Sequence, residues 1–320
     1  MIIFKTFIRT LNNKERKSLY NICFTSLFQV FSALITTILL RIIELNMLTL
    51  LTIQGSLMTL ISFIRIIVEM HEEPEMKHMM FEISALKRIL FMGFINFLMM
   101  SFTIFTLRYC CMSTVFIIFR LSQSLSLIIT KKNNLKSEDY IASILNIFGF
   151  LMVIYSPSYY YFENESNKES GKGIFFAIIV CILLTYLQVS SDKEKLKFVD
   201  LQIFVSGIMA SSFGCASSIA LDQSLYINIW VWILVIMDTA FVYFSIYFKI
   251  KTIKSLVHNI KLIPWSFVSI VVVLIFGFII FRQRISIIYA IGLIIIIVNV
   301  VLHSRSASRN KNNINENDEF

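Results

Sequence analysis

Ten apolar stretches, most of them about 20 residues long, constrain this chain more than any other feature. A helix needs about 20 mostly apolar residues to cross a bilayer. The stretches cover residues 18–40, 46–68, 87–108, 111–130, 140–157, 173–190, 201–220, 228–248, 256–281 and 285–303. We therefore predict an all-α membrane protein with ten transmembrane helices.

The composition agrees with a membrane protein and argues against a metal site. Of the 320 residues, 57% are apolar and 15% are charged, whereas soluble domains average about 45–50% and about 25%. The five Cys lack metal-ligand spacing, and the four His form no H-E-x-x-H or H-x-x-E-H cluster. We expect no metal and no cofactor, and no role for nucleic acid as a partner.

The positive charges predict the orientation of the chain. If the N-terminus is cytoplasmic and the spans alternate, 21 of the 29 Lys and Arg fall in cytoplasmic segments and 6 on the opposite side, with Arg65 and Arg120 inside spans. Positive residues in short loops concentrate on the cytoplasmic side of membrane proteins. Both termini are therefore predicted to be cytoplasmic.

The longest polar loop on the luminal side separates five spans from five. It carries the only N-x-[ST] sequon in the sequence, at Asn164, on the side of the membrane where glycosylation occurs. Asn164 is therefore either a glycosylation site or part of a chance sequon. The predicted organisation is a cytoplasmic N-terminus (1–17), a first five-helix repeat (18–157), a luminal loop (158–172), a second five-helix repeat (173–303) and a cytoplasmic, disordered tail (304–320).

An odd number of helices in each half makes the second half enter the membrane from the other side. That is the arrangement of inverted-topology repeats in secondary transporters. The halves also share a local pattern of a span, a short polar loop and a span with a glycine, at Gly149 in the first half and Gly292 in the second. We predict two inverted five-helix repeats.

Two regions resemble motifs of known transporters. Residues 46–48 and 53–56 read NML and IQGS, similar to the NFLLLxVQS opening of the second helix in GDP-mannose transporters. Residues 107–109 and 115–120 read LRY and VFIIFR, similar to ALQYL and PIYTIFK in the same transporters. The UDP-glucuronate and UDP-N-acetylhexosamine branch reads PMFTVLRR there, with Arg at the basic position.

The chain thus resembles the nucleotide-sugar transporters of the drug/metabolite transporter superfamily, best over residues 46–155. The resemblance implies exchange of a cytosolic nucleotide sugar for a luminal nucleoside monophosphate across the Golgi or endoplasmic reticulum membrane. Two GDP-mannose motifs are absent: FYNN is replaced by FVSG at 204–207, and GALNK by VHNIK at 257–261. These two departures argue against GDP-mannose as the substrate and leave the class of transporter unchanged.

Arg120 is the strongest candidate for binding substrate. A charge at the middle of a span costs about 2.5–3.5 kcal/mol on insertion scales, and a guanidinium fits phosphate oxygens. We predict that Arg120 binds the diphosphate; an ion pair with Asp238 or Glu69 is the alternative. Lys261, near the Lys of the ninth-helix motif, is either a phosphate ligand or an interfacial anchor, and Asn259 bonds either the substrate or a neighbouring helix.

Three further charged residues lie inside spans or directly beside one. Asp238 is predicted to form a structural pair, with gating or proton coupling as the alternative, because an unpaired acid would repel an anionic substrate. Arg65 and Glu69 are four residues apart on one helix and are predicted to pair with each other.

Other functions remain as alternatives. The first is a carrier of the same superfamily for another small metabolite, such as a sugar phosphate or an amino acid. An integral membrane enzyme is remote, because the sequence has no H-x-x-x-x-D motif, no paired Asp metal motif and no Ser/His/Asp set. Expected partners are the small-molecule substrate and membrane lipid, with a homodimer left open.

Overall fold

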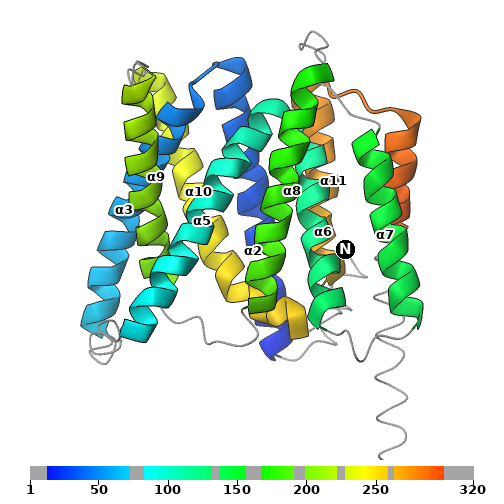
Figure 1. Cartoon of the computed structure of the whole chain (residues 1–320), viewed down its shortest axis with the longest axis horizontal. Helices are drawn as coiled ribbons and strands as arrows, with labels where there is room; N and C mark the ends of the chain where they lie inside the picture. Colours follow the sequence, from blue (N-terminus) through cyan, green and yellow to red (C-terminus); the bar gives the residue numbers. More distant parts are fainter. Residues whose placement is uncertain are drawn as a thin grey trace, which may run out of the picture.

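The computed structural model describes residues 13–72, 83–130, 137–155, 167–190, 199–221, 228–258 and 263–298. Helices make up nearly all of these ranges and stand side by side with their axes roughly upright (Figure 1). Their bounds are α2 (Asn13–Thr37), η1 (Ile38–Ile42), α3 (Met47–Glu72), α5 (Ile83–Tyr109), α6 (Met112–Thr130), α7 (Ser137–Tyr155), α8 (Asn167–Ser190), α9 (Val199–Ala220), α10 (Ile229–His258), α11 (Ile263–Phe281) and a last helix, Ile287–Val298.

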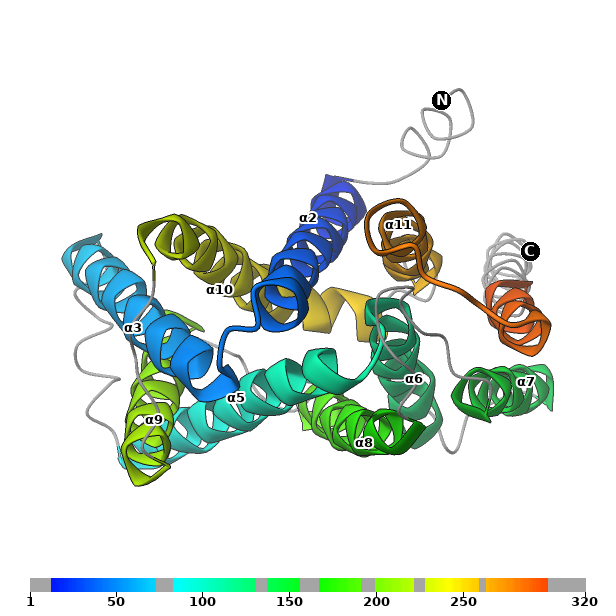
Figure 2. The same cartoon turned by 90° about the horizontal axis from the view of Figure 1, so that it is seen from above.

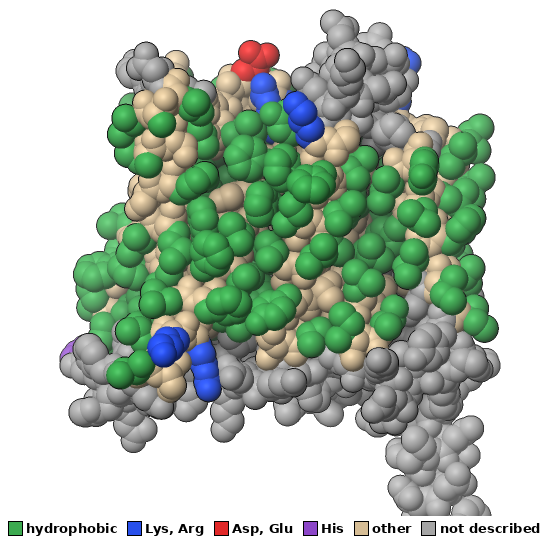
Figure 3. Space-filling model, in the orientation of Figure 1, with side chains coloured by type: hydrophobic (Ala, Val, Ile, Leu, Met, Phe, Trp, Pro, Cys, Tyr) green, Lys and Arg blue, Asp and Glu red, His purple; other side chains and the backbone are tan. Residues whose placement is uncertain are grey.

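Six helices within these ranges are long and apolar enough to cross a membrane: Leu19–Ile42, Met47–His71, Ile83–Tyr109, Gly171–Ser190, Val199–Ala220 and Ile229–Phe248. Apolar side chains cover the middle of the face seen in Figure 3, and the charged side chains visible there lie near its upper and lower ends. The protein is therefore helical over the described ranges, and it is a multi-pass membrane protein.

The other predicted spans also fall on helices. They correspond to α6, α7, α11 and Ile287–Val298, which include the shorter apolar helices Ile144–Tyr155, Ser269–Phe281 and Ile287–Val298. Several boundaries differ: α8 begins at Asn167, inside the predicted loop 158–172, and α10 runs to His258, into the predicted ninth span 256–281. Residues 256–258 end α10, and α11 begins at Ile263, because Pro264 is tolerated in the first turn of a helix and not in its interior.

Viewed from above, the helices form two rows with a pair closing each end (Figure 2). One row contains α10, α2 and α11, and the other contains α5, α8 and α6. The packing partners match between the rows: α10 packs on α2 as α5 packs on α8, and α2 packs on α11 as α8 packs on α6. The main apolar core joins residues of both rows, among them Leu39, Met100, Val115 and Val273.

Glycines bring the helices at each end into close contact. Between α3 and α9, a Cβ on Gly55 would lie 2.8 Å from the carbonyl oxygen of Gly207, and a Cβ on Gly207 would lie 2.8 Å from that of Gly55. At the other end, Cβ atoms on Gly149 and Gly292 would lie 2.9 and 2.7 Å from the opposite carbonyl oxygens. Small residues allow backbones to approach where no hydrophobic force drives helices together in lipid.

These contacts predict that Gly55→Ala lowers the thermal midpoint of the detergent-purified protein. The new methyl group would lie 2.5 Å from the backbone nitrogen of Ser211, and overpacking of this kind costs about 1–3 kcal/mol. Gly171→Ala in α8 is the matched control, because nothing lies within 4 Å of its Cβ position. That control should keep or raise the midpoint, since Ala favours a helix by about 1 kcal/mol over Gly. Equal midpoints for the two variants would contradict the proposed contact.

Candidate functional site

A cavity of about 150 Å³ lies among α2, α3, α5, α6, α8 and α10. Its apolar wall is formed by residues such as Met100, Phe116 and Leu184. Its polar side chains come from all six helices: Gln29, Ser32, Thr36, Gln54, Asn96, Thr103, Arg120, Ser122, Gln188 and Ser245. The mixture of an apolar wall and a few polar groups is typical of a small-molecule site.

Arg120 is the only charged side chain among the described residues that line this cavity. Its Nη2 donates hydrogen bonds to Ser269 Oγ at 2.8 Å and to Gln29 Oε1 at 3.2 Å, which joins α6 to α11 and α2. The ion pairs between described residues do not include Arg120. The alternative of an ion pair with Asp238 or Glu69 is therefore not seen here. A guanidinium with neutral partners retains its positive charge toward the cavity, where it favours an anion.

Asp238 lies behind the wall of the same cavity and is completely buried. Its Oδ2 accepts hydrogen bonds from Thr36 Oγ1 at 2.8 Å and from Gln54 Nε2 at 2.6 Å. Both donors line the cavity. The carboxyl group therefore joins α10 to α2 and α3 through neutral partners, and the ion pairs between described residues do not include it.

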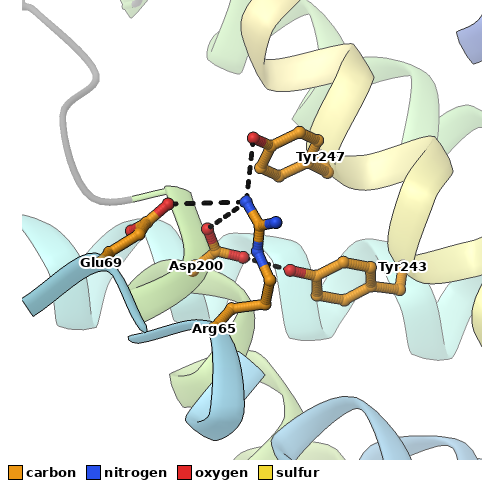
Figure 4. A network of polar contacts seen from close by, with 5 residues as sticks. All are labelled: Arg65, Glu69, Asp200, Tyr243 and Tyr247. Atoms are coloured by element: carbon orange, nitrogen blue, oxygen red, sulfur yellow. Dashed lines mark hydrogen bonds and ion pairs between the residues drawn. The ribbon is translucent and has the colours of Figure 1, made fainter. Parts of the chain in front are cut away.

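A second polar network joins α3, α9 and α10, as Figure 4 shows. Arg65 Nη2 lies 3.7 Å from Glu69 Oε1, 3.8 Å from Asp200 Oδ2 and 3.2 Å from Tyr247 Oη. The hydroxyl of Tyr243 donates to Asp200 Oδ1. Arg65 pairs with Glu69 as its spacing suggests, and also with an acid from a different helix. Because its guanidinium is surrounded by two acids, this network is not suited to bind an anion.

The remaining candidates from the sequence lie outside the described residues. These are Lys261, Asn259 and the sequon residue Asn164. Of the others, the structure brings Arg120 and Asp238 to one cavity region and places Arg65 and Glu69 in the second network.

Sequence reasoning missed the neutral partners and one acid. Gln54 lies inside the second span and within the IQGS stretch, so its polarity at that depth was a usable signal. Asp200 directly precedes the predicted span 201–220, and it is buried in the first turn of α9. No signal in one sequence pairs Thr36 with Asp238, because 202 residues separate them.

Comparison with known proteins supports the fold alone. No family model and no curated protein matches this chain. A solved structure titled "Crystal structure of protein" has a TM-score of 0.56 and 10% sequence identity, and the match covers 89% of this chain and 98% of that chain. The overall helical arrangement is therefore one that another protein also adopts, at an identity too low to transfer any activity.

The second network predicts that Asp200→Asn destabilises the protein more than Glu69→Gln does. Asp200 is 1% exposed and serves both Arg65 and Tyr243, whereas the Glu69 side chain is 28% exposed and lies 3.7 Å from Arg65 Nη2. Hydrogen bonds to charged groups contribute about 1.5–3 kcal/mol when buried, and an exposed pair contributes less than about 1 kcal/mol. Thermal midpoints in detergent provide the comparison, and an equal or larger loss in Glu69→Gln would refute the ranking.

Proposed function

We propose that the protein is a secondary transporter of organic phosphates, with nucleotide sugars as its substrates. It carries them from the cytosol into the Golgi or endoplasmic reticulum lumen in exchange for nucleoside monophosphates, by alternating access. The proposal rests on one observation: the guanidinium of Arg120 lies on the cavity wall, and its described hydrogen-bond partners are neutral. The resemblance of residues 46–155 to nucleotide-sugar transporters supplies the substrate class.

The proposal includes ten transmembrane helices in two inverted repeats. A pseudo-two-fold axis in the membrane plane would exchange the two rows of helices. Where two helices related by such an axis touch, the contact is reciprocal: each residue meets its partner as the partner meets it. The reciprocal glycine contacts Gly55–Gly207 and Gly149–Gly292 have this property. Each pairs a helix with its counterpart in the other half, the second predicted span with the seventh and the fifth with the tenth.

Cavity size favours a second candidate, a smaller phosphate such as a sugar phosphate. One water molecule needs about 10–15 Å³ of cavity volume. The cavity of about 150 Å³ therefore holds roughly ten water molecules. A nucleotide joined to a sugar is larger than that. Transport of a whole nucleotide sugar therefore requires the helices around Arg120 to move apart, whereas a sugar phosphate fits with smaller movements.

The first test is Arg120→Gln in proteoliposomes supplied with labelled GDP-, UDP- and CMP-sugars and sugar phosphates. Gln keeps a polar group beside Gln29 and Ser269 and removes the charge. A charge-assisted bond is worth about 1.5–3 kcal/mol, which corresponds to roughly a tenfold to a hundredfold loss of uptake. The matched control is Arg108→Gln, because Arg108 lies at the end of α5 and lines a different pocket.

The wild-type uptake decides between the two substrate classes, and the thermal midpoint of each variant reports its folding. A folded Arg120→Gln protein that transports at the wild-type rate would contradict the site. Absence of uptake of every phosphate by the wild-type protein would contradict the function.

Glycan mapping in a eukaryotic host tests the topology. The proposal places Asn164 in the lumen, so an endoglycosidase should increase the mobility of the wild-type protein on a gel and leave Asn164→Gln unchanged. A sequon introduced by Met76→Asn with His78→Thr, in an Asn164→Gln background, should stay unmodified because that loop is proposed to be cytoplasmic. A glycan at position 76 would overturn the orientation.

A further inference from the structure

Asp238 has an unused oxygen in the interior of the protein. Thr36 and Gln54 both donate to Oδ2, whereas Oδ1 is buried and accepts no hydrogen bond from the described residues. Gln54 Oε1 is likewise buried without a described partner. Ser32, one turn from Thr36 along α2, lies beside the same carboxyl and lines the cavity. Each of these groups either borders the cavity or bonds to a residue that does.

The charge of this carboxyl is not balanced by any described cation in bonding range. Of the cations on helices that pack against α10, Arg65 belongs to the network with Glu69, Asp200, Tyr243 and Tyr247, and Arg41 donates to the carbonyl oxygen of Leu107. A buried carboxylate without a cation is costly. The lone pairs of Oδ1 are open to a small cation.

A proton fits this site better than a metal ion. A metal ion needs several oxygens directed toward it, whereas Oδ2 here is occupied by two donors. The described residues contain no group of three His, Cys, Asp or Glu able to hold a metal. A proton needs one lone pair of Oδ1, and the new O–H donates to any nearby oxygen.

The carboxyl and Arg120 act on the same cavity with opposite charges. Thr36 and Gln54 separate Asp238 from the space that Arg120 lines. In an interior of low dielectric constant, the carboxylate repels an anion bound to Arg120. Proton binding removes this repulsion, and linkage requires that a bound anion favours the proton to the same extent.

We propose that Asp238 is a proton-binding site that couples proton uptake to anion binding in the cavity. This proposal rests on the proposed function for the anion, while the proton site itself is independent of it. The proton moves from bulk water through the cavity to Oδ1, where one O–H bond forms. On release of the anion the same bond breaks and the proton returns to water.

The first experiment tests the proton site without any ligand. Infrared spectra of the purified protein are recorded as the pH is varied, and the C=O stretch of a protonated carboxyl group is followed. We expect a titrating band that is absent in Asp238→Asn and retained in Asp200→Asn, the matched control at the other acid that is buried among the described residues. A band that survives in Asp238→Asn, or the lack of any titrating band in the wild-type protein, would overturn the proposal.

The second experiment tests the coupling. Glucose 6-phosphate and UMP are added to the protein in weakly buffered solution containing a pH indicator. We expect uptake approaching about one proton per bound anion, and affinity that rises by up to about tenfold per unit fall in pH. Asp238→Asn should bind the anion without proton uptake.

The results separate the two proposals. Anion binding with equal proton uptake in wild type and Asp238→Asn, or with none in either, would overturn the coupling. A titrating Asp238 band in a protein that binds neither anion, nor any nucleotide sugar of the transport panel, would leave the proton site standing and refute the function.

Discussion

The structure depends on the cost of a polar group that lacks a partner in an apolar layer. Backbone groups avoid that cost by bonding within helices, which is why the described ranges are almost entirely helical. Side chains face the same constraint and meet it in two ways. Arg65 is surrounded by acids and a phenol, whereas Arg120 and Asp238 rely on neutral amides and hydroxyls. The second way leaves charge available for a ligand.

Much of the fold follows from the sequence because the bilayer requirement is local. Apolar runs of sufficient length locate the helices, and the i,i+4 spacing of Arg65 and Glu69 already indicates their pairing. The end of α10 was harder to predict from the sequence. Residues 249–261 mix Lys with apolar residues, and the nearest residue that disfavours a helix interior is Pro264. The contacts that define the site join residues far apart in the chain, and one sequence contains no record of them. Thr36 with Asp238 and Arg120 with Ser269 are examples.

Aromatic residues hold corresponding pairs of helices together. Phe28 of α2 lies 5.5 to 5.9 Å from the rings of Phe241, Phe244 and Phe248 of α10. In the other row, Phe176 of α8 stacks on Phe102 and Phe105 of α5 at 5.6 and 5.5 Å. Aromatic pairs add about 0.5–1.5 kcal/mol each beyond their burial. Each row thus contains a firmly joined pair, and the cavity with its long polar side chains lies between the pairs.

This division gives α2 a particular place in the proposed transport cycle. Its bond from Thr36 to Asp238 joins it to α10, where the Phe28 contacts also hold it, so we expect that pair to move as one body. Its contact with Arg120 through Gln29, by contrast, is a single hydrogen bond of 3.2 Å to α6. A movement of one row against the other would break the longer Gln29 bond first, and then the 2.8 Å bond from Arg120 to Ser269 of α11, which lies in the same row as α2. The guanidinium donor released by that step is the group that an anion in the cavity would then occupy, so opening of the cavity and binding of the anion favour each other.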